Sequence, residues 1–364
     1  MQLRENALLA PYTTFYIGGP SRYLIFAQDT GELIEGVNFS EEKSLPLLVF
    51  GGGSNLLVSD TGFDGVAIRL ENIGMDIVEE TNYEVYLSIG SGEIWDDVVR
   101  FACEEKWWGI ENLSHIPGFC GAFTVQNVGA YGQEASKVVE SVEVYDLKDK
   151  QIKTLNQEQL EFGYRKSIFN SSEKNRYVIL STTLKLQKDG EPNLGYGDLA
   201  EKFKNSQPTI QEIRNAIIEI RNQKFPFPSE PTKGNSGSFF RGPILSEQEF
   251  GFMQAKLDEV IGNDAGIKLE KMKSRLKVPQ GYKTPTAFLI ENCVGKELVV
   301  GGAKINPAQP AIILNFSGQA TSTDVLSLYK QVSSSVFELT GVRLEIEPEL
   351  VGFTKGELAE FGVS

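Results

Sequence analysis

The feature that most constrains the fold is a glycine-rich segment, residues 116–132, in which amide and aromatic side chains stand between the glycines. Glycine lacks Cβ, so its backbone can adopt φ > 0 and lie directly against a flat or phosphorylated ligand. A flexible Gly/Ser linker would not carry the Val, Phe, Gln, Asn and Tyr found here. The pattern predicts a loop that cradles a ligand, with a tightly packed structural loop as the alternative.

A second segment of this kind lies earlier in the chain. The apolar run at 47–50 is typical of a short buried strand, and it continues directly into Gly-Gly-Gly-Ser-Asn at 51–55. Successive glycine N–H groups can form a concave nest that binds phosphate oxygens without a lysine. Neither glycine segment fits a P-loop or the Rossmann fingerprint. Alone, 51–55 is equally compatible with a plain turn, but the two segments together favour a large dinucleotide held by a fold other than Rossmann's.

The length of 364 residues predicts two or three domains with an ample core. The N-terminus carries no apolar signal region, and no apolar run approaches membrane-spanning length, so we expect a cytoplasmic protein without membrane partners. Three widely spaced cysteines, Cys103, Cys120 and Cys293, form neither a disulfide framework nor a zinc motif. We expect reduced, partly buried thiols.

The formal net charge of −14 disfavours nucleic acid as a partner but permits an anionic small substrate at a locally basic site. His115 is the single histidine, which excludes histidine-based catalytic triads and sites with several histidine ligands. We expect His115 to be a loop or packing residue, and we expect no metal. Proton transfer would then depend on Ser, Tyr, Lys, Glu or Asp.

Hydrophobic periodicity in the first half predicts an α+β architecture. Period-2 alternation predicts a strand over 85–89, residues 142–145 and 151–155 read as a hairpin, and 177–186 reads as a further strand. An amphipathic helix is expected over 93–106. Its predicted buried stripe is Ile94, Val98 and Phe101. Helices are too few here for a doubly wound parallel sheet.

The composition changes after residue 188, where a polar, turn-rich connector begins. Thr209 and Glu212 form a capping-box pair that opens a helix, and a second helix is expected over 321–339. These patterns place a domain boundary near residue 200.

Three further segments could carry chemistry. Arg165, in Tyr-Arg-Lys-Ser, could hold a carboxylate or stabilise developing negative charge, although a surface cation is the simpler interpretation. Ser238 lies on a turn at 234–240. No histidine is available to activate it as a nucleophile, so it is a candidate proton donor. The alternative is a turn hydroxyl without a function. The segment 342–347 alternates strictly, which places Glu347 on the face opposite the core-facing residues. That face could carry a catalytic acid or could simply be exposed to solvent.

Taken in order, the segments resemble the UDP-N-acetylenolpyruvoylglucosamine reductase (UDP-N-acetylmuramate dehydrogenase) family. The resemblance covers residues 6–352, and so many motifs in family order make it highly specific. The matching segments are 14–19, 51–57, 109–111, 116–118, 125–132, 164–169, 196–199, 234–240 and 344–347.

The resemblance implies an α+β fold: an FAD-binding domain of the vanillyl-alcohol-oxidase/PCMH type over 1–200, with two subdomains split near 70. A smaller substrate-binding domain over 201–364 would follow, and its strand at about 342–352 would return towards the active site. FAD would be bound non-covalently. The implied FAD contacts are Gly51, Gly52, Gly53, Ser54, Asn55, Ile116, Pro117, Gly118, Gly121, Gln126, Asn127, Gly129, Ala130, Tyr131 and Gly132.

The implied reaction is the NADPH-dependent reduction of UDP-N-acetylglucosamine enolpyruvate to UDP-N-acetylmuramate, in peptidoglycan precursor synthesis. Arg165 and Glu347 match the pair that stabilises the reacting carboxylate, and Ser238 matches the serine that protonates C2. The implied substrate contacts are Tyr164, Tyr196, Lys224 and Gln309. The segment around Tyr196 indicates the tyrosine-loop (type I) subfamily, and we expect a monomer.

The chain departs from the family pattern in several places, although the three catalytic matches are intact. A small residue is common where Phe123 stands, Phe119-Cys120 is unusual after Ile-Pro-Gly, and Pro348-Glu349 replaces an apolar-basic pair. Two further departures are Gly242 in place of Asn and Asn306 in place of His. Another FAD oxidoreductase of the same fold, or a non-catalytic flavin or sugar-nucleotide binder, remains an alternative.

Overall fold

The computed structural model describes residues 1–363, without the side chains of 263 and 264, and these residues form two compact units. The first unit consists of Met1–Ala7, Ser21–Gly53 and Asp64–Gln223. The second consists of Leu8–Pro20, Ser54–Phe63 and the chain from Lys224 onward. The chain passes from the first unit to the second for the last time between Gln223 and Lys224, and two short N-terminal segments belong to the second unit. The functional domains 1–200 and 201–364 stay predictions.

A four-stranded sheet opens the first unit. Its strands lie in the order β1 (Gln2–Leu8), β2 (Pro20–Ala27), β5 (Phe63–Leu70) and β3 (Leu47–Phe50). Helix α1 (Thr30–Glu42) starts at Asp29, whose side chain accepts from Glu32 N, and its Leu33 and Val37 pack on the sheet residues. The strand predicted at 47–50 is confirmed, but its burial is only partial over the first three residues, because β3 is an edge strand.

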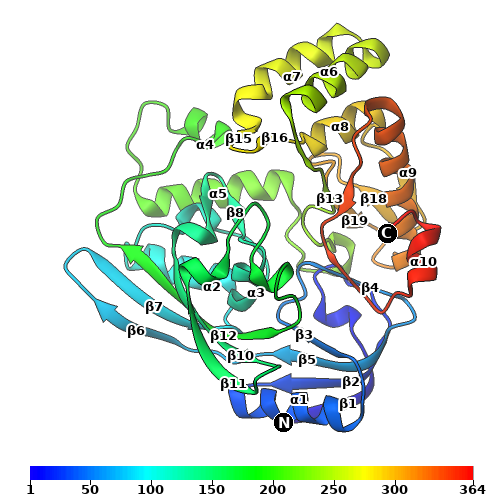
Figure 1. The fold of residues 1–364 in the computed structure, drawn as a ribbon. Helices are drawn as coiled ribbons and strands as arrows, with labels where there is room; N and C mark the ends of the chain where they lie inside the picture. The colour runs from blue at the N-terminus through cyan, green and yellow to red at the C-terminus, as the bar shows by residue number, and fades with distance from the viewer. Residues whose placement is uncertain (364) are drawn as a thin grey trace. The chain divides into compact units, whose positions relative to one another are not determined.

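A five-stranded antiparallel sheet forms the other layer of the first unit (Figure 1). Its strands lie in the order β11 (Gln151–Asn156), β10 (Val139–Asp146), β12 (Tyr177–Gln187), β7 (Glu84–Gly90) and β6 (Met75–Glu80). The predicted strands and hairpin are therefore confirmed. Helices α2 (Trp95–Glu104) and α3 (Cys120–Val125) share one hydrophobic core with β7, β10 and β12.

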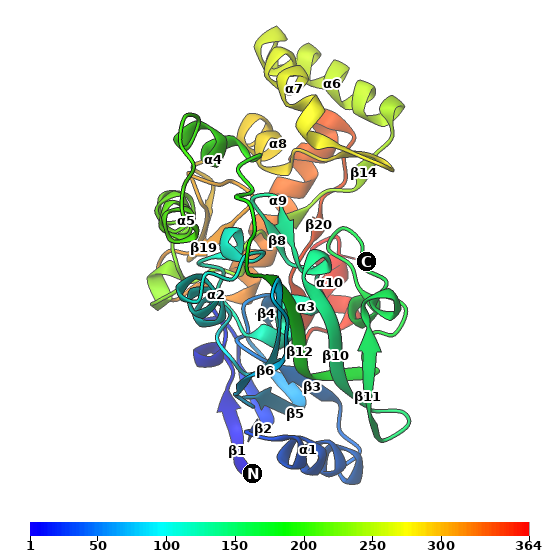
Figure 2. The ribbon, with the colours of Figure 1, turned by 90° about the vertical axis from the view of Figure 1, so that its left-hand side faces the viewer.

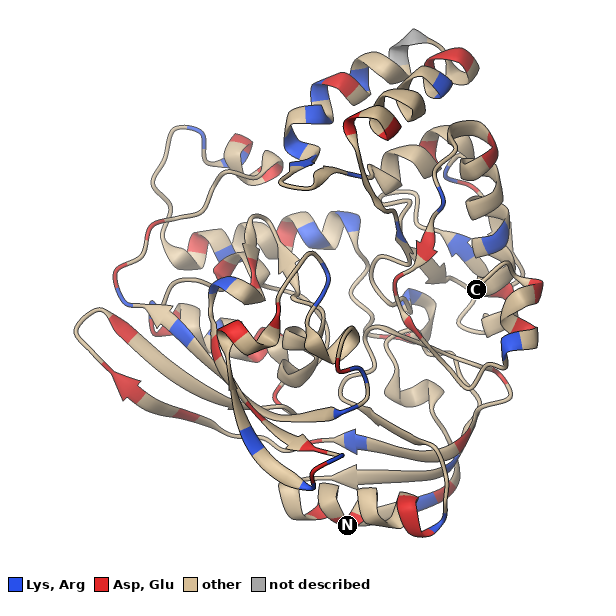
Figure 3. Cartoon of the chain, in the orientation of Figure 1, with Lys and Arg blue, Asp and Glu red and all other residues tan. Residues whose placement is uncertain are grey.

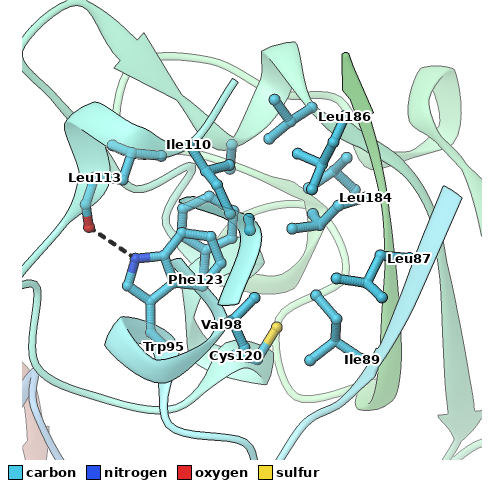
Figure 4. Close-up of a cluster of buried hydrophobic side chains, with 14 of the residues drawn as sticks. Leu87, Ile89, Trp95, Val98, Ile110, Leu113, Cys120, Phe123, Leu184 and Leu186 are labelled. Carbon is cyan, nitrogen blue, oxygen red and sulfur yellow. Dashed lines mark hydrogen bonds between the residues drawn. The ribbon is translucent and has the colours of Figure 1, made fainter. Parts of the chain in front are cut away.

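The buried face of α2 differs from the predicted stripe. Ile94 is 50% exposed, because it precedes the helix in an extended conformation, and Phe101 is only partly buried. The face that packs on the core consists of Trp95, Val98, Val99, Ala102 and Cys103. Figure 4 shows the indole of Trp95 in this core, with its N–H donating to Leu113 O at 3.0 Å. The helix starts at Trp95, two residues after the predicted start at 93, and Val98 is the residue of the predicted stripe that is fully buried.

The hairpin between β10 and β11 is closed by the buried side chain of Asp146. Its Oδ1 accepts from the N–H groups of Lys148 and Asp149 at 3.0 and 3.1 Å, and its Oδ2 accepts from Lys153 Nζ at 2.7 Å and Arg176 Nη2 at 2.9 Å. Burial alone would raise the pKa of Asp146, but the hydrogen bonds from Arg176, Lys153 and the backbone outweigh it and lower the pKa well below its usual value.

We therefore expect Asp146→Asn to reduce the free energy of unfolding by about 3 kcal/mol at pH 7, because it removes the buried carboxylate that both cations contact. A carboxylate with a lowered folded-state pKa stabilises the fold above its unfolded pKa, and this contribution is lost as the pH falls through the folded pKa. Urea unfolding at pH 7 and pH 3 should show the difference shrinking at pH 3. The control is Asp149→Asn, an exposed partner of the same cations, with an expected cost below about 1 kcal/mol.

Helix α5 (Ile210–Lys224) confirms the predicted capping pair. Thr209 N donates to Glu212 Oε2 at 2.8 Å, and Glu212 N donates to Thr209 Oγ1 at 3.3 Å. The chain after α5 reads Phe-Pro-Phe-Pro, and a residue before proline avoids the helical region, so the helix ends at Lys224.

Among its described residues, the second unit combines short sheets with five α-helices. Its strand sets are β13 (Phe240–Arg241) with β20 (Glu345–Ile346); β14 (Ile244–Leu245), β16 (Gly281–Lys283) and β15 (Lys277–Val278); β17 (Val299–Val300), β18 (Ala303–Ile305) and β19 (Ile313–Asn315); and β21 (Glu349–Val351) parallel to β4 (Leu56–Val58). The helices are α6 (Glu247–Ile261), α7 (Asn263–Leu276), α8 (Thr286–Cys293), α9 (Ser322–Thr340) and α10 (Lys355–Glu360). Helices α6 and α7 lie side by side (Figure 1, Figure 2).

Helix α9 confirms the helix predicted over 321–339. Thr321 is its N-cap and forms a capping box with Asp324, and Gly341 ends it in the left-handed conformation. The periodicity predicts a buried stripe of Val325, Leu328, Val332, Val336 and Leu339, and all of these are buried except Leu339, which is partly buried. In the alternating segment that follows, the predicted core-facing residues are Val342, Leu344 and Ile346; the first two are buried and Ile346 is partly buried.

Acidic and basic residues are interspersed along the elements of each unit (Figure 3). In the described part of the chain, no helix combines the length and apolarity that a membrane crossing requires. All three cysteines are free. Burial raises the pKa of Cys103 to about 12 and that of Cys293 to about 11, so these thiols stay protonated.

Candidate active site

The glycine-rich segment 116–132 forms a structured loop in the first unit. Helix α3 interrupts it, which the sequence pattern did not predict, and β8 (Gly129–Ala130) pairs with β9 (Gln133–Glu134) at its end. The backbone takes positive φ at Gly118 (121°), Asn127 (44°), Tyr131 (48°) and Gly132 (86°). Gly118 and Gly132 therefore use the conformational freedom of glycine, whereas Asn127 and Tyr131 take positive φ without it.

The two glycine segments contact each other within the first unit. A Cβ placed on Gly52 would lie 3.0 Å from Gly118 Cα, and one on Gly51 would lie 3.1 Å from the Phe119 side chain. The guanidinium of Arg69 lies 5.2 Å from the centroid of the Phe119 ring. Glycine at these positions avoids a tight contact that any side chain would make with the neighbouring segment.

This arrangement fits FAD. Successive backbone N–H groups can bind a pyrophosphate where one residue has a left-handed conformation. Gly53, at the end of the first glycine run, has such a conformation with φ 61°. Gly51, Gly52 and Gly53 belong to the first unit, whereas Ser54 and Asn55 belong to the second, where Asn55 O accepts from Glu349 N at 2.9 Å.

We expect Gly52→Val to release FAD, because its branched side chain would enter the contact between Gly52 and Gly118. The purified variant should retain less than about a tenth of the wild-type flavin, corresponding to a loss of at least 1.4 kcal/mol at subsaturating FAD. The measurement is the ratio of flavin to protein absorbance after gel filtration. Gly251→Val on α6 is the control, since a Cβ there meets no atom within 4 Å. Equal flavin contents in both variants would contradict the assignment.

The bulky Phe123 points into the protein core, which explains how this departure from the family pattern is accommodated. Its ring stacks on Trp95 with centroids 3.7 Å apart and an interplanar angle of 11° (Figure 4). Cys120 is also fully buried in that core. Of the unusual residues, Phe119 is the one that touches Gly51 and Gly52.

Arg165 lies beside the glycine loop. Both of its terminal nitrogens are 3.3 Å from Gly129 O, and its backbone has φ 53°. Asn170 Nδ2 donates to Arg165 O at 3.1 Å, which holds this strained backbone in place. The neighbouring Tyr164 is 48% exposed, and the Arg165 guanidinium lies 5.7 Å from its ring centroid.

Tyr196 packs against the end of the same loop. Its ring meets the ring of Tyr131 edge to face at 5.5 Å, and Tyr196 remains 56% exposed. Burial raises the pKa of Tyr131, so its phenol stays protonated. The first unit therefore brings Arg165, Tyr164 and Tyr196 to the predicted flavin loop.

Asn112 joins these segments and was not predicted. It is fully buried, and its Nδ2 donates to Tyr131 O and to Asn193 O, both at 2.8 Å. Asn193 Nδ2 donates in turn to Gly132 O at 3.1 Å. Asn112 thus ties the flavin loop to the connector that leads to Tyr196. The only sequence signal was its position directly after the family segment 109–111.

In the second unit, the loop of Ser238 is held by the side chain of Asn235. Asn235 Nδ2 donates to Pro226 O at 3.0 Å and to Lys233 O at 2.9 Å, and its Oδ1 accepts from Gly237 N at 3.0 Å. Thr14 Oγ1 donates to Asn235 O at 2.7 Å, which accounts for the family segment 14–19 in this unit. Gly237, at φ 72°, forms the turn before Ser238.

Strand pairing places the backbone of Glu347 opposite Phe239, the residue that follows Ser238. Phe240 on β13 pairs with Ile346 on β20, and Glu347 N donates to Phe239 O at 2.9 Å. Both Ser238 and Glu347 are partly exposed. The periodicity of 342–347 could not select Glu347 among the acids; its pairing beside Ser238 distinguishes it from Glu345, which pairs with Arg241 at 2.7 Å.

Gln309 lies on the turn that leads back to Ser238. Ile312 N donates to Gln309 O at 3.0 Å, and Ile312 forms a β-bridge with Ser238. Lys224, the last residue of α5, is partly buried in the same unit. The predicted residues therefore separate into an Arg165 set in the first unit and a Ser238 set in the second.

Gly242 departs from the family pattern for a packing reason, because a Cβ there would lie 2.3 Å from Thr284 Cβ. His115 Nε2 is 2.8 Å from Asn222 Oδ1, and burial lowers its pKa, in keeping with the packing role expected of it. Among the described residues, no group of three His, Cys, Asp or Glu side chains could hold a metal ion.

Two protein-family models match the chain. One describes an FAD binding domain and matches residues 21–156; the other describes the C-terminal domain of UDP-N-acetylenolpyruvoylglucosamine reductase and matches residues 229–351. With the glycine cradle, these matches define an FAD-dependent oxidoreductase, and they confirm the expected fold class and cofactor.

Curated relatives match nearly the whole chain. UDP-N-acetylenolpyruvoylglucosamine reductase of Aliivibrio fischeri is 35% identical over 347 residues, covering 95% of this chain and 94% of the relative. The protein of that name from Shewanella sediminis is 36% identical over 355 residues, covering 97% of each. The crystal structure of the reductase from Thermus caldophilus has a TM-score of 0.65 and 25% identity, covering 96% of this chain and all of that one. The chain belongs to the UDP-N-acetylenolpyruvoylglucosamine reductase family.

Proposed function

We propose that the chain reduces UDP-N-acetylglucosamine enolpyruvate to UDP-N-acetylmuramate, with FAD as cofactor and NADPH as electron donor, in peptidoglycan precursor synthesis. The observation that carries the proposal is identity of 34–36% over 95–97% of the chain to relatives that bear the name of this reductase. A match of this extent covers the Arg165 set in the first unit and the Ser238 set in the second, rather than the flavin domain alone.

The residues have distinct proposed roles. When bound, FAD would supply the hydride that is added to C3 of the enolpyruvyl group. Arg165 and Glu347 would stabilise the charge that delocalises from C2 into the carboxylate. Ser238 Oγ would donate a proton to C2, giving the lactyl ether, and would regain a proton from water.

Substrate positioning falls to the remaining predicted residues. Lys224 would bind the diphosphate, Gln309 the nucleotide, and Tyr164 and Tyr196 the substrate beside the flavin loop. The contact of Tyr196 with Tyr131 supports this role, because it joins a substrate residue to a proposed flavin residue. We further propose that the chain acts as a cytoplasmic monomer, for which light scattering should give a protein mass of 40.3 kDa.

Anaerobic spectroscopy tests the function. The purified protein should be yellow, NADPH should bleach the flavin, and the enolpyruvyl nucleotide should restore its absorbance with one UDP-N-acetylmuramate formed per flavin. A protein that NADPH never bleaches would be a non-catalytic binder. Bleaching by NADPH without reoxidation by the enolpyruvyl nucleotide would indicate a different FAD oxidoreductase.

A further inference from the structure

The side chain of Asn306 connects the two residues assigned to the substrate's nucleotide end. Asn306 is 4% exposed, and its Nδ2 donates to Lys224 O at 2.8 Å. The last carbonyls of a helix lack partners within the helix, and Pro226 and Pro228, just after α5, have no N–H to offer. Asn306 therefore caps α5 at the residue that carries the proposed diphosphate-binding ammonium group.

The same residue closes the turn that carries Gln309. Asn306 Oδ1 accepts from Ala308 N at 3.1 Å, its carbonyl accepts from Gln309 N at 3.1 Å, and its own N–H donates to Ile312 O at 2.9 Å. A side-chain oxygen that accepts from the N–H two residues on forms an Asx turn. The side chain and backbone of Asn306 thus fix Gln309 from one side and Lys224 from the other.

We propose that Asn306 is a positioning residue for the nucleotide diphosphate of the substrate, acting through Lys224 and Gln309; this rests on the function proposed above. The planar amide supplies a donor to Lys224 O and an acceptor to Ala308 N at the same time and at any physiological pH. Loss of the donor releases the end of α5 and lets the Lys224 side chain sample positions away from the diphosphate.

The probe is UDP, which carries the diphosphate but not the reacting group. We expect Asn306→Ala to weaken UDP binding to the oxidised enzyme about tenfold, as measured by calorimetry. A tenfold change in Kd corresponds to the loss of about one hydrogen bond. In single-turnover reoxidation of chemically reduced enzyme, the enolpyruvyl nucleotide concentration at half-maximal rate should rise by a similar factor. The rate at saturation should stay within about twofold, because Ser238 is untouched.

Asn315→Ala is the matched control. Asn315 is fully buried in the same unit, its Nδ2 donates to Phe15 O at 3.1 Å, and its Oδ1 accepts from Ala320 N at 2.9 Å. The variant loses the same kinds of hydrogen bond and should lower the melting temperature comparably, but UDP affinity should be unchanged. Equal loss of UDP affinity in both variants would show that Asn306 acts only through stability and would overturn the proposal.

Two further substitutions keep the proposal testable if Asn306→Ala folds poorly. Asn306→Asp keeps the acceptor for Ala308 N but loses the donor to Lys224 O, and it should weaken UDP binding at least as much. Asn306→His restores a ring N–H donor and should recover most of the affinity. If the wild-type enzyme neither binds UDP nor reacts with the enolpyruvyl nucleotide, the proposed function is contradicted. If the wild-type enzyme does both and the Asn306→Asp variant binds UDP normally, only the inference about Asn306 is overturned.

Discussion

Ser238→Ala should slow flavin reoxidation by the enolpyruvyl nucleotide by about 100-fold or more, the usual contribution of general acid catalysis. Flavin reduction by NADPH should stay near the wild-type rate, because no proton reaches carbon in that half-reaction. Asn235 holds this turn through its hydrogen bonds with Pro226 O, Lys233 O and Gly237 N, so removal of the Ser238 hydroxyl should leave the loop in place. Anaerobic stopped-flow spectroscopy measures the two half-reactions separately.

The control for this variant is Ser236→Ala on the same loop. Ser236 is 3% exposed, and its hydroxyl has no hydrogen-bond partner among the described residues, so the substitution removes no interaction seen in the structure. Both half-reactions should proceed normally in the control. If Ser238→Ala slowed them equally, the role of Ser238 as proton donor would be refuted.

Arg165→Met should also slow reoxidation by about 100-fold or more, because one charged donor to a developing anion contributes that much in comparable sites. The substitution keeps the apolar stem but removes the guanidinium, which lies beside the flavin loop at Gly129 O. Arg165→Lys should recover only part of the rate, since an ammonium group lacks the planar fork that matches a carboxylate.

Lys166→Met is the control for the charge itself, because Lys166 is the adjacent, exposed cation in the same unit. It should leave the reoxidation rate unchanged. The flavin content of each variant must be measured in parallel. Slowing of both half-reactions together with loss of FAD would mean that Arg165 supports the loop at Gly129 rather than the substrate.

Much of the local structure was predictable from the sequence. The capping pair at Thr209 and the apolar stripe of α9 depend on side chains three and four positions apart, so periodicity captured them. The stripe of α2 was wrong at Ile94 because the helix begins at Trp95 and leaves Ile94 before it in an extended conformation. The apolar run of β3 could not show that the strand lies at a sheet edge.

The residue types of the site could also be predicted, but their partners could not. No pattern linked Asn306 to Lys224, which lie 82 positions apart, or Asn112 to Asn193, which lie 81 apart. Likewise, alternation left Glu345 and Glu347 equivalent until β13 paired with β20 and placed Glu347 next to Phe239.

The sequence by itself determined where the backbone needs glycine, which segments are helix or strand, and which family motifs are present, because these follow from covalent chemistry and from neighbours along the chain. Only the tertiary structure decided that Phe123 stacks on Trp95 in the core, that the two glycine segments touch, and that Asn306 caps α5. Such contacts join residues distant in the chain, and the free energy that selects them is set by burial and close packing of the whole fold.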